Sequence, residues 1–279
     1  MTKKNEVVTR KAPELRFPDF RGLKEWETNA LNNIAHPIKN RGHTENSKNI
    51  LILSSEHGIV GQGEYFDKKI ASENADRYIS IKLNDFVYND RTTKLFVYGA
   101  IKRLFRHEAG LVSPIYKCFR FNSDQNPIFW EWYFESSSHE GQLKSLINEG
   151  ARTGRYNISI DGFLSMPVLS PSQKEQQKIA DCLISINDLI TVQVQKIETL
   201  KAHKKSLMHQ LFPVEGETVP CMRFPEFREA GQWEESTLQG VATIRSGSTP
   251  ARSNAKFYVD GSIPWVKTTD LAPEKRIPC

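Results

Sequence analysis

A segment of 20 residues occurs twice in this chain, at residues 16–35 and 223–242, called here the first and second opening segments. They align without a gap at a constant offset of 207 residues, and nine of the 20 positions are identical. The identical residues are Arg16, Phe17, Pro18, Phe20, Arg21, Trp26, Glu27, Leu31 and Ala35, which recur as Arg223, Phe224, Pro225, Phe227, Arg228, Trp233, Glu234, Leu238 and Ala242. Self-similarity of this kind indicates repeated structural units. We therefore expect one complete unit and the beginning of a second.

Residues 14–170 have the pattern of a domain with both strands and helices. Residues 50–54 and 78–83 are rich in β-branched side chains, which favours strands. Residues 127–147 begin at a proline and predict a helix that breaks near residues 136–141. The chain is 38% apolar and 10% aromatic, enough for a packed core. The fold class that we expect is α+β, with residues 14–170 as its first domain.

Residues 171–212 predict one long helix. Pro171 is a start signal and Pro213 a stop signal, and the residues between them include neither glycine nor proline. Such a helix is about 55–60 Å long, at about 1.5 Å per residue.

This helix has an apolar seam whose steps alternate between four and three residues, with interruptions at Gln193 and Lys204. That spacing is typical of a coiled coil. The seam residues are Ile179, Leu183, Ile186, Ile190, Ile197, Leu200, Leu207 and Leu211. Because one helix cannot bury its own seam, we expect a partner helix.

Residues 223–279 contain the second opening segment and are too few for a second unit as long as the first. They predict the start of an incomplete second domain, with a further strand at residues 263–266. Trp26 and Trp233 each follow a polar run and precede an apolar-periodic stretch, so we predict that both anchor a core.

Four motifs occur in an order that matches one protein family. Residues 112–119 read VSPIYKCF, and residues 155–171 read RYNISIDGFLSMPVLSP. Residues 170–188, SPSQKEQQKIADCLISIND, place a proline-rich turn before a Glu-Gln pair and an Ile-Ala-x-x-Leu run. Residues 247–271 read GSTPARSNAKFYVDGSIPWVKTTDL. With these motifs, the chain from residue 14 onward resembles the specificity subunits of type I restriction-modification systems.

The resemblance implies a role in reading DNA. In that family each target-recognition domain reads one half of a bipartite site in double-stranded DNA, and two long antiparallel helices set the spacing between the halves. Modification (methyltransferase) subunits methylate adenine and restriction subunits cleave, so the specificity subunit itself is not an enzyme and needs no cofactor. The N-terminal residues 1–11 are polar and basic without an apolar stretch, so we expect a cytoplasmic location by default.

The chain departs from this family in length, because it resembles a subunit truncated after its first conserved helix. Our hypothesis is that two copies pair through the seam and read a symmetric split site. An inactive truncation and a coiled-coil scaffold without a DNA partner remain as alternatives.

Candidate DNA contacts lie in polar, basic loops of the first domain. Arginine, lysine and asparagine are the side chains suited to phosphates and base edges, and the net charge of +5 permits such a partner. We favour residues 152–157, because Gly150 and Gly154 allow a close approach of the backbone. The predicted contacts are Arg152, Arg155, Asn157, Arg91, Lys94, Arg41, Lys48 and Arg103. Loops that are merely solvated are the alternative for each cluster.

Other chemistry finds little support in the sequence. Residues 126–129, Asn-Pro-Ile-Phe, superficially resemble a methyltransferase motif but lack its second proline, and residues 61–63 are an isolated Gly-x-Gly. The four cysteines are widely spaced, and the histidines lack metal-ligand spacing. No stretch approaches the roughly 20 apolar residues of a membrane span. We therefore predict no catalytic residue, no metal site and no membrane partner.

Overall fold

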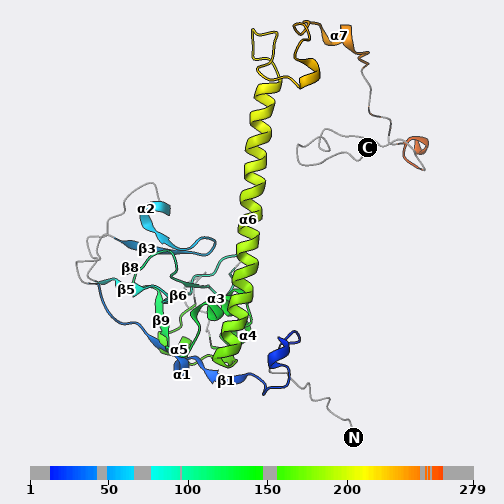
Figure 1. Ribbon diagram of the computed structural model, residues 1–279. Helices are drawn as coiled ribbons and strands as arrows, with labels where there is room; N and C mark the ends of the chain where they lie inside the picture. The colour runs from blue at the N-terminus through cyan, green and yellow to red at the C-terminus, as the bar shows by residue number, and fades with distance from the viewer. Residues whose placement is uncertain are drawn as a thin grey trace. The chain divides into compact units, whose positions relative to one another are not determined.

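The computed structural model describes residues 13–42, 49–65, 77–94, 96–146, 156–245, 249, 251 and 253–259. The chain divides into two units, residues 1–195 and 196–279. Figure 1 shows the sheets of the first unit and the long helix α6 in which the division falls. The three predicted segments, residues 14–170, 171–212 and 223–279, stay a prediction.

One sheet of the first unit has four antiparallel strands in the order β2-β9-β6-β7. Their bounds are Ala35–Pro37 for β2, Phe86–Asn89 for β6, Ala100–Arg103 for β7 and Lys117–Phe121 for β9. Gly99 leads into β7 with a φ of +84°, and a Cβ there would lie 2.3 Å from the carbonyl oxygen of Asn89. Glycine is therefore required at this close approach.

The second sheet has the order β4-β3-β8-β5, in which β3 and β8 are parallel and the other pairs are antiparallel. Its strands are Ile50–Ser54 for β3, Gly58–Gly61 for β4, Ile79–Lys82 for β5 and Ala109–Val112 for β8. The strands predicted at residues 50–54 and 78–83 are confirmed as β3 and β5.

A third sheet has two strands, β1 (Glu27–Ala30) and β10 (Pro167–Ser170). They are antiparallel, with Glu27 opposite Ser170 and Ala30 opposite Pro167. This pairing joins the beginning and the end of the first unit, because β1 belongs to the first opening segment and β10 leads into α6.

The remaining elements of this unit before α6 are short helices. They are η1 at Pro18–Phe20, α1 at Leu31–Ile34, α2 at Gln62–Tyr65, α3 at Pro127–Glu135, α4 at Glu140–Leu146 and α5 at Ile160–Leu164. The helix predicted over residues 127–147 is confirmed as α3 and α4, with its break where serines follow Glu135. The fold is α+β, as predicted.

Aromatic packing joins the first sheet to the helices. The rings of Phe121 on β9 and Trp130 on α3 stack with centroids 4.8 Å apart, and those of Tyr88 on β6 and Phe163 on α5 stack at 4.6 Å. Burial of one such side chain stabilises a fold by about 1.5–3 kcal/mol. A second apolar cluster contains residues of both four-stranded sheets, among them Val87 of β6.

The long helix α6 (Gln173–Leu211) has 39 residues, which confirms the helix predicted over residues 171–212. Only its beginning is packed: Glu175, Gln176 and Ala180 are its buried residues. The Gln176 carboxamide accepts the backbone N–H of Asn126 at 2.9 Å, and α3 and α4 lie beside these first turns (Figure 1). From residue 185 to residue 206 every residue is exposed.

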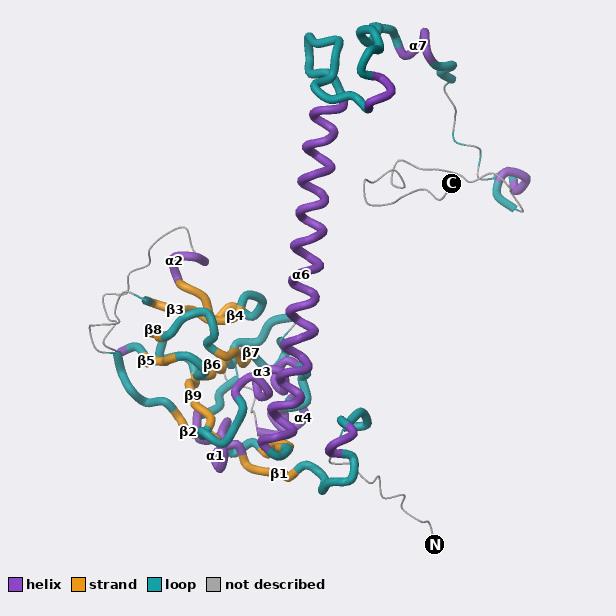
Figure 2. Tube along the Cα trace, viewed as in Figure 1, coloured by secondary structure: helices purple, strands orange, loops and turns teal. Residues whose placement is uncertain are grey.

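Beyond α6 the described residues form loops and short helices, and none of them lies in a strand (Figure 2). The helices are η4 at Pro225–Phe227, α7 at Leu238–Val241 and η5 at Ala255–Phe257. The strand predicted at residues 263–266 lies outside the described residues. The backbone N–H of Met222 donates to Gln210 at 2.8 Å, which fixes the chain against the end of α6.

The two predicted tryptophan anchors differ. Trp26 is confirmed: it packs against the aromatic core, 6.0 Å from the ring of Phe129. The prediction for Trp233 is wrong, because this side chain is 47% exposed and its ring contact is with Phe212. The second opening segment lacks, among the described residues, the strand and helix that cover Trp26 in the first unit.

Candidate nucleic-acid interface

A cleft of about 510 Å³ in the first unit is lined by four positively charged side chains and by no carboxylate. The cations are Lys39, Arg41, Arg77 and Lys117. Lys39, Arg41 and Arg77 are exposed, and no ion pair joins them to a described residue. The apolar part of the lining comes from residues that include Ile79 and Ile160. No described carboxylate thus competes with a polyanion for these three charges.

Close backbone packing positions Arg41. It forms an isolated antiparallel bridge with Ile79, and the N–H of Gly42 donates to the carbonyl of Tyr78 at 2.8 Å. A Cβ at residue 42 would lie 2.6 Å from a methyl group of Leu111, so a larger residue would push the segment away. Glycine here lets the segment after β2 reach the start of β5, which brings Arg41 near Arg77.

Asp90 links this cleft to a second group of predicted contacts. Its carboxylate pairs with the ammonium of Lys117, and its carbonyl accepts the N–H of Tyr156 at 3.2 Å. Arg91 follows Asp90 and Asn157 follows Tyr156, and both are exposed. The structure therefore brings together Arg91 and Asn157, which are far apart in the sequence, beside the basic cleft.

Two other predicted contacts lie elsewhere. Arg103 on β7 donates from Nε and Nη2 to one carboxylate oxygen of Glu131, at 2.9 and 2.6 Å, and from Nη1 to Asn84 at 2.8 Å. It ties β7 to α3, and its side chain is 12% exposed. Lys94 is exposed in a separate hollow that also contains Glu56.

Arg152, Arg155 and Lys48 lie outside the described residues, so their part in the interface stays a prediction. Sequence reasoning missed Arg77 and Lys117. Arg77 is an isolated cation just before a strand, and Lys117 begins another. Arg77 is 36 residues and Lys117 is 76 residues from Arg41 in the chain (77 − 41 and 117 − 41), so only the pairing of distant segments places them beside it.

The seam of α6 is largely uncovered. Its central residues Ile186, Ile190, Ile197 and Leu200 are 48 to 57% exposed. Ile179 and Leu183 are half-buried near the first unit, as are Leu207 and Leu211 at the other end. Leu189 and Val194, which flank the seam, are also exposed and widen the apolar stripe.

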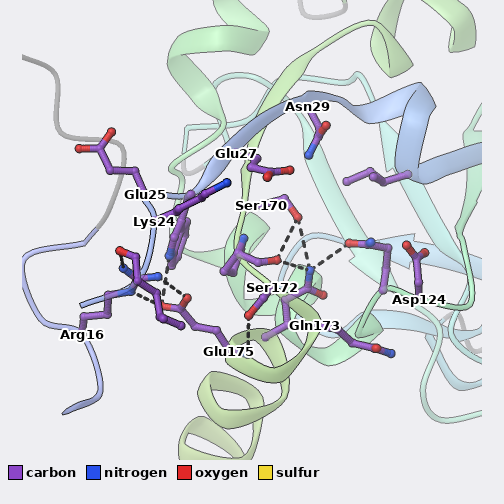
Figure 3. A pocket seen from close by; sticks show the side chains of 16 residues that line it. Arg16, Lys24, Glu25, Glu27, Asn29, Asp124, Ser170, Ser172, Gln173 and Glu175 are labelled. Atoms are coloured by element: carbon purple, nitrogen blue, oxygen red, sulfur yellow. Dashed lines mark hydrogen bonds and ion pairs between the residues drawn. The ribbon is translucent and has the colours of Figure 1, made fainter. Parts of the chain in front are cut away.

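A corner between β10 and α6 holds the first opening segment (Figure 3). The guanidinium of Arg16 forms two hydrogen bonds with Glu175 of α6, from Nε and from Nη2, each of 2.7 Å. The indole N–H of Trp26 donates to the same carboxylate at 3.2 Å. The hydrogen bond with Glu175 raises the pKa of Arg16. Since Glu175 is 2% exposed, this contact is an anchor rather than an open site.

The corner borders a pocket of about 620 Å³ with four carboxylates and two cations. The carboxylates belong to Glu25, Glu27, Asp124 and Glu175, and the cations to Arg16 and Lys24 (Figure 3). Phosphate groups would be repelled there, so this pocket is a poor DNA site compared with the basic cleft.

Asn126, in the stretch that superficially resembles a methyltransferase motif, has a structural role, and the thiol of Cys118 is buried. Asn126 is the N-cap of α3: its side chain accepts the N–H groups of Ile128 and Phe129. Burial raises the pKa of the Cys118 thiol to about 12, so it is protonated at neutral pH and is a poor nucleophile. No group of metal-binding side chains occurs within the described part of the chain. None of the described helices has the length and apolar content that a membrane crossing requires.

No protein-family model matches this chain. The HsdS subunit from Thermoanaerobacter tengcongensis is similar in structure, at 15% identity and a TM-score of 0.43, over 71% of this chain and 53% of that one. A chain from work on complex assembly and conformational transition of the type I R-M system is similar at 14% identity and a TM-score of 0.39. That match covers 67% of this chain and 45% of the other. The chain thus spans about half the length of both structures.

Proposed function

We propose that this chain is a DNA-sequence-reading specificity subunit of a type I restriction-modification complex. It reads one half-site with its first domain. It directs adenine methylation and restriction, which partner modification and restriction subunits carry out, and it is not itself an enzyme.

The basic cleft is the observation that carries this proposal. Three exposed cations without a described ion pair, Lys39, Arg41 and Arg77, line it, and phosphate contacts from arginine and lysine supply much of the affinity of a protein for DNA. Exposed Arg91 and Asn157 stand beside the cleft, where side chains of these types are suited to base edges. The assignment to a restriction system rests on the sequence motifs at residues 112–119, 155–171, 170–188 and 247–271.

Binding to duplex DNA over a range of salt concentrations tests the role of the cleft. Arg41→Ala and Arg77→Ala should each weaken binding and reduce the slope of log affinity against log salt by about one. Arg106→Ala is the matched control, because this arginine is exposed on the same unit and lies outside the cleft lining.

Equal effects of all three variants on DNA binding would show that the cleft is not part of the interface. Absence of salt-dependent binding by the wild-type chain would favour the alternative of a coiled-coil scaffold. Mapping of methylated adenines in cells that contain the chain and a modification subunit tests the assignment, and a symmetric interrupted motif is expected.

Pairing of two copies through α6 is part of the proposal. Four isoleucine and leucine side chains of the seam are about half exposed, and burial of the exposed half of each contributes roughly half of the about 1.5–3 kcal/mol that full burial gives. Sedimentation at low micromolar concentration should give a dimer, and Ile190→Lys with Ile197→Lys should give a monomer. A monomeric wild-type chain contradicts the pairing and favours an inactive truncation.

A further inference from the structure

The residues at the end of β6 connect three segments of the first unit. Asn89 ends this strand, and its side chain accepts the backbone N–H of Arg91 at 3.2 Å. Between these two residues, Asp90 contacts Lys117 of β9 through its carboxylate and Tyr156 through its carbonyl. Residues from three distant parts of the sequence therefore meet at Asp90, and we call this contact the β6 junction.

The β6 junction is closely packed. The side chain of Asp90 is 3% exposed, and a Cβ on Gly99 would lie 3.1 Å from the Cα of Asp90. The hydroxyl of Tyr88 donates to the carbonyl of Tyr98 at 2.9 Å. The ring of Tyr98 in turn stacks on that of Tyr156, with centroids 6.2 Å apart. Asp90 and Tyr156 are thus held together both by a hydrogen bond and by the packing around them.

Lys117 differs from the other cations of the basic cleft. Its side chain is 16% exposed, and its ammonium is paired with the carboxylate of Asp90. The three other cations are exposed and have no ion pair with a described residue. Lys117 lies opposite Tyr88 in the β6–β9 pair, so Asp90, two residues further along, is its diagonal neighbour. A phosphate would have to displace a buried carboxylate to reach this ammonium.

Two exposed residues flank the β6 junction. Arg91 follows Asp90, and Asn157 follows Tyr156. Arginine is suited to guanine and asparagine to adenine in the major groove of DNA. Segments joined by backbone hydrogen bonds lie about 4.7–4.9 Å apart, and successive base pairs of a duplex lie about 3.4 Å apart. The two side chains therefore begin within about two base-pair steps of each other.

We propose that Arg91 and Asn157 read base pairs no more than two steps apart, and that Lys117 is the positioning residue of this pair rather than a phosphate contact. The ion pair with Lys117 fixes Asp90, which precedes Arg91 in the chain and holds the segment of Asn157 by its carbonyl. The three exposed cations of the cleft supply the affinity that does not depend on sequence. This inference rests on the proposed function and assigns separate roles to the residues of the same interface.

Loss of the Lys117 ammonium would change the β6 junction as well as the charge of the cleft. The Asp90 carboxylate would then be a buried charge without this countercharge, so it should move toward water. That movement would take its carbonyl away from Tyr156 and change the spacing between Arg91 and Asn157. Hydrogen bonds weaken steeply when their geometry is poor, so contacts with base edges should be lost while phosphate contacts remain.

Selection of duplexes from a random DNA library by the full-length chain tests the proposal, because it reports every position of the half-site at once. Arg91→Ala and Asn157→Ala should each relax one position, with discrimination reduced by about tenfold or more. The two relaxed positions should lie no more than two steps apart. Lys117→Met should relax both of them, whereas Lys117→Arg retains the ion pair and should keep the wild-type preference.

Salt dependence distinguishes a positioning role from a phosphate contact. Lys39→Met is the matched control, because Lys39 is an exposed lysine in the same lining. It should reduce the slope of log affinity against log salt by about one and leave the sequence preference unchanged. Lys117→Met should leave the slope unchanged and lose the preference. Partial unfolding of a variant would lower its affinity for all duplexes alike, so it would not produce this result.

Circular dichroism must show that the variants are folded. Lys117→Gln keeps a hydrogen-bond donor for the carboxylate and is the milder variant, which should relax both positions to a smaller extent. Folded Lys117 variants with the wild-type preference overturn the inference alone, as do relaxed positions more than two steps apart. A wild-type chain that binds no duplex, or that binds all sequences alike, overturns the proposed function and this inference with it.

Discussion

The two opening segments share nine residues and the same short helices, yet one is docked and the other is exposed. Leu31 of the first is completely buried, whereas its equivalent Leu238 is 73% exposed. The first segment has β10 and the start of α6 as its cover. The comparison separates two properties of the segment. Its short helices are encoded within the 20 residues, whereas its burial depends on a strand and a helix outside them.

Loss of the corner carboxylate should have the largest effect. Glu175→Gln leaves the guanidinium of Arg16, which is 10% exposed, without its countercharge. The free energy of unfolding of the first unit should fall by about 3–5 kcal/mol. Chemical denaturation measures this change. Glu226→Gln in the exposed second segment is the control, and an equally small effect of both would contradict the anchor.

A matched pair of leucine truncations tests the comparison directly. Leu31→Ala opens a cavity in the core and should cost about 2–5 kcal/mol. Leu238→Ala removes an exposed side chain and should change stability by less than about 0.5 kcal/mol. Thermal or urea unfolding compares them. Similar losses would mean that the second segment is also packed.

Acid should weaken the first unit through His139, which is 6% exposed. Burial lowers the pKa of this imidazole to about 4 from 6.5, and its buried Nδ1 has no hydrogen-bond partner among the described residues. Between pH 6.5 and 4 the unfolded chain binds a proton that the folded chain excludes, so the free energy of unfolding falls by about 3 kcal/mol. That contribution is fully present above pH 6.5.

Denaturation at a series of pH values measures this slope. His139→Phe should flatten the dependence of the free energy of unfolding on pH. An unchanged dependence would mean that other groups cause it. The second opening segment contains no histidine, so the protection of its amides from hydrogen exchange should not follow this curve.

The smallest expected effect concerns the cap of α7. The side chain of Thr237 accepts the N–H of Gly240 at 3.2 Å, and its loss should cost the helix about 1 kcal/mol. Hydrogen exchange at the α7 amides should accelerate in Thr237→Ala. By contrast, α1 begins after Ala30 without a side-chain cap and is held by packing. An unchanged α7 would mean that contacts beyond the cap maintain it.

The sequence predicted the elements whose signals are local. Residues 50–54 alternate β-branched side chains and are β3; Pro127 begins α3; and the absence of glycine and proline from residues 172–212 agrees with α6. Trp233 shows the limit of such reasoning. Its pattern is that of Trp26, and a pattern carries no information on whether a covering corner is present.

The candidate site was less predictable, because it depends on contacts between distant segments. Arg41 was found from its polar loop, while Arg77 and Lys117 join it only through the register of β5 and β9. Arg103 has the same loop-like signal, and the structure gives it a carboxylate, Glu131, that is 28 residues away. Charge density in a sequence does not tell a paired arginine from an available one.

The β1–β10 pair has a consequence for engineering. Glu27 and Ser170 are neighbours across two strands, so the stretch of chain between them leaves and returns at one place. A different domain inserted between β1 and β10 would meet the same two attachment points, and it would have to supply its own partner for Gln176 of α6 in place of Asn126. The β1–β10 pair thus gives the first unit two adjacent attachment points just before α6.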